Sequence, residues 1–445
     1  MKKIGIVSLG CPKNLVDTEV MLGILNKSGK YEITNDEKEA DVVIVNTCGF
    51  IESAKQESIE AILEMAALKK DKCKLLLVTG CLAERYRDEI IKEIPEVDSV
   101  MGVGDYINIA KVIDSAFDGE KSVICGHQEN ICHLEEERII STGKAYAYIK
   151  IAEGCDNKCT YCAIPSIRGA YKSRSIENIV TEAQKIARSG IKEIVIIAQD
   201  TTRYGMDLYG KKMLVPLLQE LSKIDGIHWI RLLYCYPDEI DDNLINEIAT
   251  NDKICKYLDI PIQHSSDKIL KLMGRRDRKK DIENLIVKLR REIPEIVIRT
   301  TFITGFPGED EEDFLDMKYF IQRLEFDRLG VFVYSKEEGT PAALMKNQVD
   351  DDVKQERYDI IMQLQKEITE AKNKNRIGKT YDVIIEGIAD DGIFYTGRTY
   401  AESPDIDGYV YITTREPLRI GEITRVKILN TDSYDLIGDV VDESA

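Results

Sequence analysis

Strand-like apolar segments alternate with segments of helical periodicity through most of this chain of 445 residues. In the first block, strands are expected at residues 3–8, 41–46 and 74–79, and helices begin near Asn14, Glu52 and Ala83. This alternation is typical of a parallel sheet, because parallel strands need crossover connections that helices usually provide. The sequence therefore predicts an α/β fold whose N-terminal domain is a small doubly wound parallel sheet.

The same alternation continues from Tyr146 to about residue 345. Six strands are expected there, and all but the last precede a helical pattern: 147–151, 193–198, 229–234, 257–261, 297–303 and 328–333. Such units predict an open (β/α)6 barrel with functional groups at the carboxyl ends of its strands. The charged, periodic segment 350–376 predicts a long linking helix. A small all-β barrel is then predicted from short strands at 380–386, 393–398, 409–413 and 423–430.

These patterns give three domains, at residues 1–125, 146–376 and 377–445, with a linker at 126–145. The polar bridge that we expect over residues 105–145 contains Cys125, His127, Cys132 and His133. Their spacing matches no common zinc motif, and adjacent cysteine and histidine side chains cannot easily bind one ion. An ordinary connector or an edge hairpin is therefore favoured over a zinc site.

Three cysteines lie on one short loop directly after the expected strand 147–151. Cys155, Cys159 and Cys162 have the spacing C-x3-C-x2-C. A structural zinc site normally takes four protein ligands, and a 4Fe-4S cluster also needs four, so three thiolates leave one position open. The open position indicates chemistry. A zinc site completed from elsewhere and a loop of unligated cysteines are the alternatives.

Three other cysteines share one position in the N-terminal block. Cys11, Cys48 and Cys81 each follow one of its strands, and each has Gly or Thr beside it. Ligands of open parallel sheets gather at the carboxyl ends of the strands, so these cysteines can converge in one crevice. They predict a second site of three thiolates. Three buried cysteines without a ligand are the alternative, since cysteine is common in sheet interiors.

Several residues of the second block are candidates for binding or scaffold roles. The Gly-rich loop at 304–309 follows the fifth expected strand, which makes Gly305 a candidate for a cofactor contact. His264 is a candidate proton carrier or substrate contact, although single histidines are as often hydrogen-bonded scaffold residues. Cys235 and Cys255 have no partner pattern and are expected to be structural.

The loop that contains Cys155 has Tyr161 just before its last cysteine, and it resembles the signature of the radical S-adenosylmethionine (SAM) enzymes. The resemblance implies a 4Fe-4S cluster whose unique iron is chelated by SAM. One electron from the cluster then cleaves SAM to a 5′-deoxyadenosyl radical. We expect Tyr161 to contact the adenine and the Gly305 loop to contact SAM, and Arg174 is also considered.

With both cysteine groups, essentially the whole chain resembles the methylthiotransferases, which combine a UPF0004-type domain, a radical SAM barrel and a TRAM domain. The resemblance implies that Cys155, Cys159 and Cys162 hold the radical SAM cluster. It also implies that Cys11, Cys48 and Cys81 hold an auxiliary 4Fe-4S cluster. In this family SAM is used twice, as methyl donor to a sulfur on the auxiliary cluster and as radical source. A sulfur donor and an electron donor such as flavodoxin or ferredoxin are implied as well.

Four segments resemble the RimO type within this family: 10–19, 162–169, 198–205 and 263–266. That type methylthiolates the β-carbon of an aspartate in small-subunit ribosomal protein S twelve. The alternative within the family is a tRNA adenosine methylthiotransferase. A cluster-carrying scaffold or RNA-binding protein without catalysis is the alternative outside it.

The charge of the chain bears on its partner. The formal net charge is −18, and residues 377–445 carry 14 acidic and 6 basic residues, a net charge of −8. A domain that grips tRNA needs cations for its phosphates, so this segment favours a basic ribosomal protein. A merely solvated acidic face is the alternative.

The location of the protein is predicted from its apolar segments and its N-terminus. No apolar run approaches the roughly 18 residues of a membrane span. The N-terminus enters a strand pattern without a signal peptide, so the eleven cysteines are expected to be reduced thiols. We expect a monomer in the cytoplasm.

Overall fold

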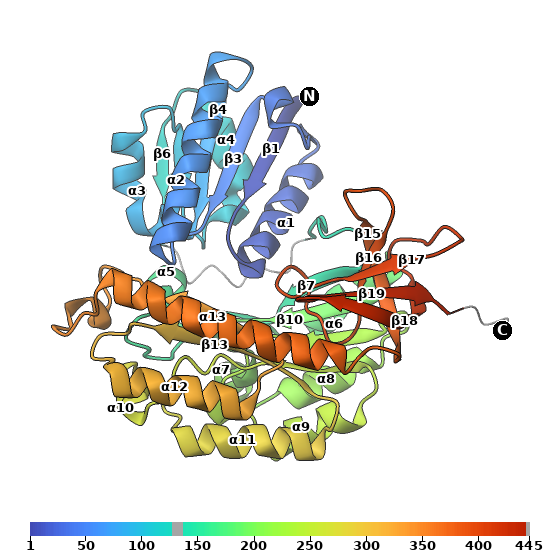
Figure 1. Cartoon of the computed structure of the whole chain (residues 1–445). Coiled ribbons are helices and arrows are strands. Elements are labelled where there is room, and N and C mark those ends of the chain that lie inside the picture. The colour runs from blue at the N-terminus through green and yellow to red at the C-terminus, as the bar shows by residue number, and fades with distance from the viewer. Residues whose placement is uncertain (127–136, 442–445) are drawn as a thin grey trace. The chain divides into compact units, whose positions relative to one another are not determined.

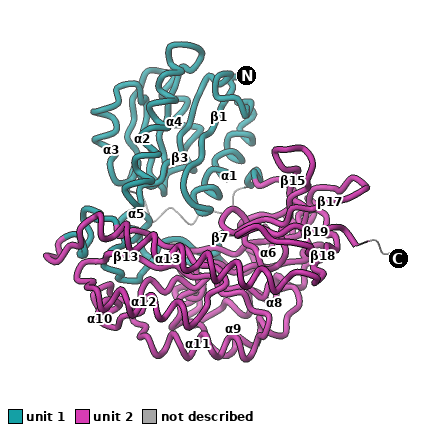
Figure 2. Tube along the Cα trace, in the orientation of Figure 1, with its two compact units in different colours: residues 1–141, 150–174, 335–343 teal, residues 142–149, 175–334, 344–445 magenta. Residues whose placement is uncertain are grey.

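The computed structural model describes residues 1–126 and 137–441, and these form two compact units (Figures 1 and 2). The first unit comprises residues 1–141, 150–174 and 335–343, and the second comprises 142–149, 175–334 and 344–445. The predicted domain boundaries stay a prediction. No helix among the described residues is both long and apolar enough to cross a membrane.

The first unit contains a sheet of six strands in the order β2-β1-β3-β4-β5-β6, and every neighbouring pair is parallel. The predicted strands are β1 (Lys2–Ser8), β3 (Val42–Thr47) and β4 (Leu75–Gly80). Sequence patterns missed β2 (Tyr31–Ile33), β5 (Ser99–Met101) and β6 (Ser122–Ile124). Three residues are too few for an alternation to be recognised.

Helices cover both faces of this sheet, as the doubly wound prediction requires. One face packs against α2 (Glu52–Ala67) and α3 (Cys81–Glu93) in a core that includes Ile62, Val78 and Leu82. The other carries α1 (Pro12–Lys27) and α4 (Ile109–Phe117), which contact each other. The predicted N-terminal architecture is therefore confirmed.

The predicted polar bridge is wrong for residues 109–124. This segment forms α4, with Val112 and Ile113 buried, and then β6 at the edge of the sheet. Both elements lie within the predicted domain 1–125, but the helix has only nine residues and the strand only three, which are too few for a clear pattern. His127, Cys132 and His133 lie outside the described residues.

The second unit contains the sheet of the predicted barrel, with strand order β14-β13-β12-β11-β10-β7. Its strands are β7 (Tyr146–Lys150), β10 (Glu193–Ile197), β11 (Trp229–Leu232), β12 (Ile254–Asp259), β13 (Val297–Thr304) and β14 (Arg328–Val333). Neighbouring strands from β10 to β14 are parallel. All six strands of the predicted barrel are thus present.

The connecting helices bury one apolar stripe each, as in α6, where Ile179, Ala183 and Ile186 are buried. The helix begins where the Ser175 side chain accepts a hydrogen bond from the Asn178 N–H, which satisfies a free donor of the first turn. The main helices are α6 (Ile176–Arg188), α8 (Leu214–Ser222), α9 (Asp242–Thr250), α11 (Lys279–Glu292) and α12 (Glu311–Leu324).

The last helix, α13 (Asp351–Lys374), does more than link two domains. Ile361, Gln365 and Thr369 are buried at four-residue spacing, and the helix packs on β13 and β14. The Gln365 Nε2 donates a hydrogen bond of 2.9 Å to the carbonyl of Phe326. The charge of this segment predicts a linking helix, but the helix follows the sixth strand and packs on the sheet of the barrel.

The C-terminal residues form a closed barrel of five strands in the order β15-β16-β17-β19-β18. These are β15 (Thr380–Ile388), β16 (Tyr395–Arg398), β17 (Val410–Thr413), β18 (Ile423–Asp432) and β19 (Asp435–Val440). Val383, Val410 and Val426 lie in its core. The predicted all-β barrel is confirmed, but β19 was missed because Gly438 and two aspartates interrupt its apolar pattern.

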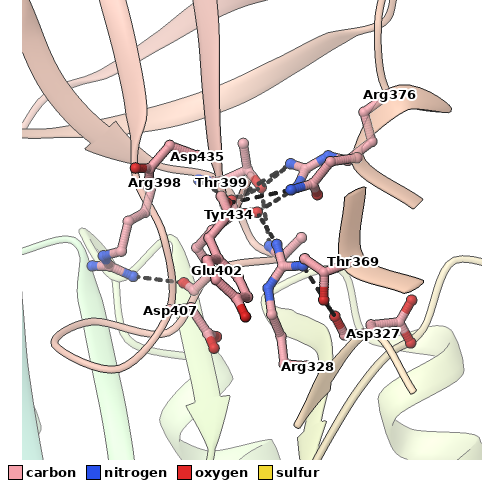
Figure 3. A network of polar contacts seen from close by, with 12 residues as sticks. Asp327, Arg328, Thr369, Arg376, Arg398, Thr399, Glu402, Asp407, Tyr434 and Asp435 are labelled. Carbon is pink, nitrogen blue, oxygen red and sulfur yellow. Dashed lines mark hydrogen bonds and ion pairs between the residues drawn. The ribbon is translucent and has the colours of Figure 1, made fainter. Parts of the chain in front are cut away.

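Buried ion pairs join this small barrel to the strands of the larger one, within the second unit (Figure 3). Arg398 contacts the carboxylates of Glu193 at 2.7 Å and Glu386 at 2.5 Å. Glu402 accepts a hydrogen bond of 3.1 Å from Arg328 and is also paired with Arg376. The loop at 399–407 thus holds the small barrel on the larger one.

Candidate active site

Cys11, Cys48 and Cys81 follow three strands that are neighbours in the first sheet, β1, β3 and β4. Because these strands are parallel, their carboxyl ends lie at one edge, and the three thiols are close enough to influence one another. Burial raises the pKa of Cys48 to about 12, and the neighbouring Cys81 and Cys11 contribute to the rise. The three thiols therefore converge at one edge of the sheet in the first unit, and their role as a ligand site stays a prediction.

Glycine allows the close approach of two of these segments. Gly10 has a φ of +87°, and a Cβ atom there would lie 2.7 Å from the Cβ of Cys48 and 3.0 Å from its Sγ. At Gly80, with a φ of +98°, a Cβ atom would lie 2.4 Å from the Asn46 side-chain oxygen. Only glycine fits both the backbone conformation and the space.

Hydrogen bonds from Asn14 link the segments that carry these cysteines. Its Nδ2 donates to the carbonyls of Leu9 at 3.1 Å and Thr47 at 2.9 Å, which follow or end β1 and β3. Its Oδ1 lies 3.6 Å from the Sγ of Cys81. One buried amide thus spans the ends of three strands.

The charge around this group favours a thiolate at Cys11. Burial alone would raise the pKa of Cys11, but the cations Lys13 and Arg168 and the backbone N–H groups of Asn14 and Lys13 lower it below its usual value. The thiolate is the form of cysteine that binds metal.

The second group, Cys155, Cys159 and Cys162, lies on a loop closed by the short hairpin β8 (Ala152–Glu153) and β9 (Lys172–Ser173). The Cys155 N–H donates to the Gly169 carbonyl at 3.1 Å. Burial raises the pKa of Cys162 to about 12, with contributions from Cys159 and Cys155. These three thiols therefore also form one group, and all three are only partly buried.

Each group offers three cysteine thiols, which are the donors that an iron–sulfur cluster takes. Among residues 1–126 and 137–441, no three His, Cys, Asp or Glu side chains are placed to hold one metal ion. In a 4Fe-4S cluster each cysteine binds a different iron, so the thiols surround a space instead of meeting at one point. Three soft sulfur donors per group are also the chemistry that such clusters require.

Arg168 connects the two groups within the first unit, and we did not anticipate this from the sequence. It ends the short helix α5 (Ile164–Arg168) that follows Cys162, and its Nη2 lies 3.5 Å from the Sγ of Cys81. The same nitrogen donates to Asn14 at 2.5 Å and to Asp17 at 3.0 Å. Both Arg168 and Asp17 lie in the segments that resemble the RimO type, which was the available signal.

The remaining candidates have mostly structural partners. Arg174 is buried and donates a hydrogen bond of 2.7 Å to the carbonyl of Lys150. His264 is fully buried, with its Nδ1 accepting from the Ser266 N–H at 2.9 Å and its Nε2 3.3 Å from Glu309. This favours the scaffold alternative for His264. Cys235 and Cys255 are also buried.

Gly305 and Tyr161 belong to different units. The Gly305 N–H donates to Glu309 at 2.9 Å, and a Cβ atom there would lie 2.1 Å from the Cγ of Lys354. Tyr161 is half-buried in the first unit. Their contact with SAM stays a prediction.

Three family models match the chain in the predicted order. They are the uncharacterised protein family UPF0004 over residues 3–102, the radical SAM superfamily over 149–321 and the TRAM domain over 377–441. Among curated proteins, the ribosomal protein uS12 methylthiotransferase RimO of Acetivibrio thermocellus is 59% identical and covers 100% of this chain and 99% of its own length. The protein of the same name from Clostridium botulinum is 56% identical, with 99% of each chain covered. The chain belongs to the RimO family.

This RimO family member also has the fold of more distant radical SAM proteins whose structures are solved. The radical SAM methyltransferase TsrM from Kitasatospora setae, with cobalamin and a 4Fe-4S cluster bound, matches with a TM-score of 0.59 at 14% identity. The match covers 77% of each chain. The cobalamin-dependent enzyme OxsB matches with a TM-score of 0.51 at 13% identity, over 83% of this chain and 56% of its own. At these identities the similarity extends to the fold alone.

Proposed function

We propose that this RimO family member is a radical SAM transferase that places a methylthio group on the β-carbon of an aspartate in ribosomal protein uS12. Each reaction uses two molecules of SAM and a sulfur donor. The identity of 59% over the whole chain to a uS12 methylthiotransferase carries the proposal. The two cysteine groups of the first unit support it, because the reaction needs a radical source and a sulfur carrier.

In this proposal each cysteine group holds one cluster. Cys155, Cys159 and Cys162 bind the cluster that supplies the electron for SAM cleavage, and Cys11, Cys48 and Cys81 bind the auxiliary cluster that presents the sulfur. Tyr161 and the Gly305 loop contact SAM. The hairpin β8–β9 closes the first loop, and Asn14 holds the strand ends that carry the second group.

The charge of the TRAM domain supports a basic partner, although the excess of acidic over basic residues is smaller among its exposed residues than in the whole segment. Within residues 377–441, eight acidic and five basic residues are exposed. Arg398 is fully buried against Glu193 and offers no charge to a nucleic acid. Because tRNA binding needs exposed cations, this surface fits a ribosomal protein better than tRNA. A flavodoxin or ferredoxin is the expected electron donor, and the enzyme is expected to act as a monomer.

The cluster assignment is tested by reconstituting the protein under anaerobic conditions. About eight irons per chain are expected, as two 4Fe-4S clusters require. With SAM and a reductant, the protein should release 5′-deoxyadenosine and methylthiolate uS12. Replacing Cys11, Cys48 and Cys81 with Ala should leave SAM cleavage largely intact and abolish methylthio transfer. Equal loss of both activities in a folded variant would contradict separate roles.

The choice of substrate is tested in cells that lack the gene. Digests of uS12 should lose the methylthio mass on aspartate, while the methylthiolated adenosines of tRNA remain. Loss of the modification from tRNA with uS12 still modified would overturn the proposal. A wild-type protein that holds iron but releases no 5′-deoxyadenosine would instead favour a non-catalytic scaffold.

A further inference from the structure

We infer that Arg168 is a positioning residue of the auxiliary cysteine group and sets the reduction potential of the cluster that this group holds, through its hydrogen bond to Cys81. The inference rests on the proposed function, because it requires that cluster. The inference gives a role to Arg168, which follows the loop of one cysteine group and whose side chain contacts a cysteine of the other group.

The contact between Arg168 and Cys81 is direct and shielded from water. The Nη2 lies 3.5 Å from the Sγ, within the range of hydrogen bonds to sulfur, and the two residues are 2% and 4% exposed. Ile167, beside Arg168, packs with Cys81 in a small apolar cluster that includes Val103 and Ala163. In such surroundings a charged hydrogen bond is stronger than in water.

A network of buried charges fixes the guanidinium in this orientation. Its Nη2 also donates to Asn14 and Asp17, and its Nη1 lies 2.9 Å from the Glu153 carboxylate. Lys150 is paired with the same two carboxylates, Asp17 and Glu153. The two carboxylates balance the two cations, so the network can remain charged in the interior. Arg168 therefore cannot turn away from Cys81 without breaking several buried contacts.

We expect the contact to change the reduction potential of the auxiliary cluster. Hydrogen bonds to the sulfur ligands of an iron–sulfur cluster and nearby positive charge shift its potential, because they stabilise the more negative, reduced form. An arginine keeps its charge at any pH at which the protein is folded. Arg168 should thus hold the auxiliary potential higher than it would be without the guanidinium.

The test needs a protein in which only the auxiliary cluster gives a signal. Replacing Cys155, Cys159 and Cys162 with Ala in the full-length chain provides this background, and Arg168→Gln is then added. The reduced fraction of the cluster is measured by electron paramagnetic resonance at fixed solution potentials. We expect the ratio of reduced to oxidised cluster to fall at least tenfold at a given potential, which is about 59 mV for a one-electron couple. Arg87→Gln changes a half-exposed arginine on α3 and should leave the ratio unchanged.

The possible results separate a failure of the proposed auxiliary site from a failure of the role inferred for Arg168. If the background protein binds no cluster, the auxiliary site of the proposed function fails, whatever Arg168 does. If Arg168→Gln holds the same iron with an unchanged ratio, the inference alone is overturned. If Arg168→Gln loses its iron, Arg168→Lys is measured, which keeps the charge without the planar fork. A lowered ratio in Arg168→Lys supports the inference, because the charge stays and the hydrogen bond from the guanidinium is lost. An unchanged ratio in Arg168→Lys rejects the hydrogen bond to Cys81 as the cause, and loss of iron in both variants rejects the inference in favour of a purely structural role.

Discussion

At the scale of single residues, the space around the auxiliary cysteines depends on a glycine. Gly10 precedes Cys11 and takes a φ of +87°, and its missing Cβ leaves room for the Cys48 side chain. Any other residue there would meet both a left-handed backbone and a contact of 2.7 Å. Since the strain and the clash act together, the substitution should displace a cysteine and not only lower stability.

We predict that Gly10→Ala reduces the iron content of the reconstituted protein from about eight to about four per chain. The reason is the displacement of Cys48 by the new methyl group. Gly29→Ala is the matched control, because Gly29 has a φ of +66° with nothing within 4 Å of its Cβ position. It shares the backbone cost of about 1–2 kcal/mol without the clash. Equal iron in the two variants would show that Gly10 does not shape the site.

At the scale of elements, the loop 399–407 is stabilised by Glu402. This carboxylate is 1% exposed and is paired with Arg328 and Arg376. Burial alone would raise the pKa of Glu402, but the two arginines and the hydrogen bonds from Arg376 and Thr399 lower it to about 2. The loop therefore depends on a carboxylate that remains ionised.

Replacing Glu402 with Gln should destabilise the second unit by about 3–5 kcal/mol, because two buried arginines lose their partner. Urea unfolding followed by circular dichroism measures the change. Glu416→Gln is the control, since Glu416 is exposed, and it should change stability by less than about 0.5 kcal/mol. Similar unfolding midpoints for both variants would contradict a structural role for Glu402.

The same carboxylate predicts a pH dependence. Its pKa is lowered in the folded state, so its contribution is present above the unfolded value of about 4.3 and is lost as the pH falls towards 2. The difference in stability between the wild-type protein and Glu402→Gln should therefore shrink from pH 6 to pH 3. A difference that stayed constant over this range would mean that Glu402 does not titrate in this way.

At the scale of the whole molecule, the TRAM domain is a structural part of the second unit. Its Arg398 is buried against Glu193 of β10, and its Tyr400 carbonyl accepts a hydrogen bond of 2.7 Å from Arg231 of β11. Its exposed surface, which carries the acidic residues, is available for a partner. The buried contacts that stabilise the domain thus involve other residues than the exposed acidic ones that we propose for substrate binding.

Removing residues 377–445 should lower the melting temperature of the remaining chain, because Arg231 and Arg328 lose buried partners. By contrast, replacing the exposed Asp390 and Asp439 with Lys should preserve melting and weaken uS12 binding, as measured by titration calorimetry. A truncated chain as stable as the full one would show that the domain is an independent module. Unchanged uS12 binding in the double variant would show that those charges do not contact the substrate.

The parts predicted from the sequence are those with local signals. Alternation of period 2 and 3.6 located all six strands of the larger barrel, and the spacing of Cys155, Cys159 and Cys162 needs only one loop. The shared position of Cys11, Cys48 and Cys81 after their strands predicted their convergence, because parallel strands end at one edge. The short strands β2, β5 and β6 and the interrupted β19 gave too few residues for a pattern.

The sequence by itself therefore determined the order of the domains, the two cysteine groups and the family resemblance. Only the tertiary structure decided which buried charges meet: Arg168 with Cys81, Glu402 with Arg328, and Arg398 with Glu193. These partners lie far apart in the chain, and an arginine in a sequence looks the same whether it faces water or a thiol. Packing brings such groups together and removes water from between them, and that removal gives each contact its strength.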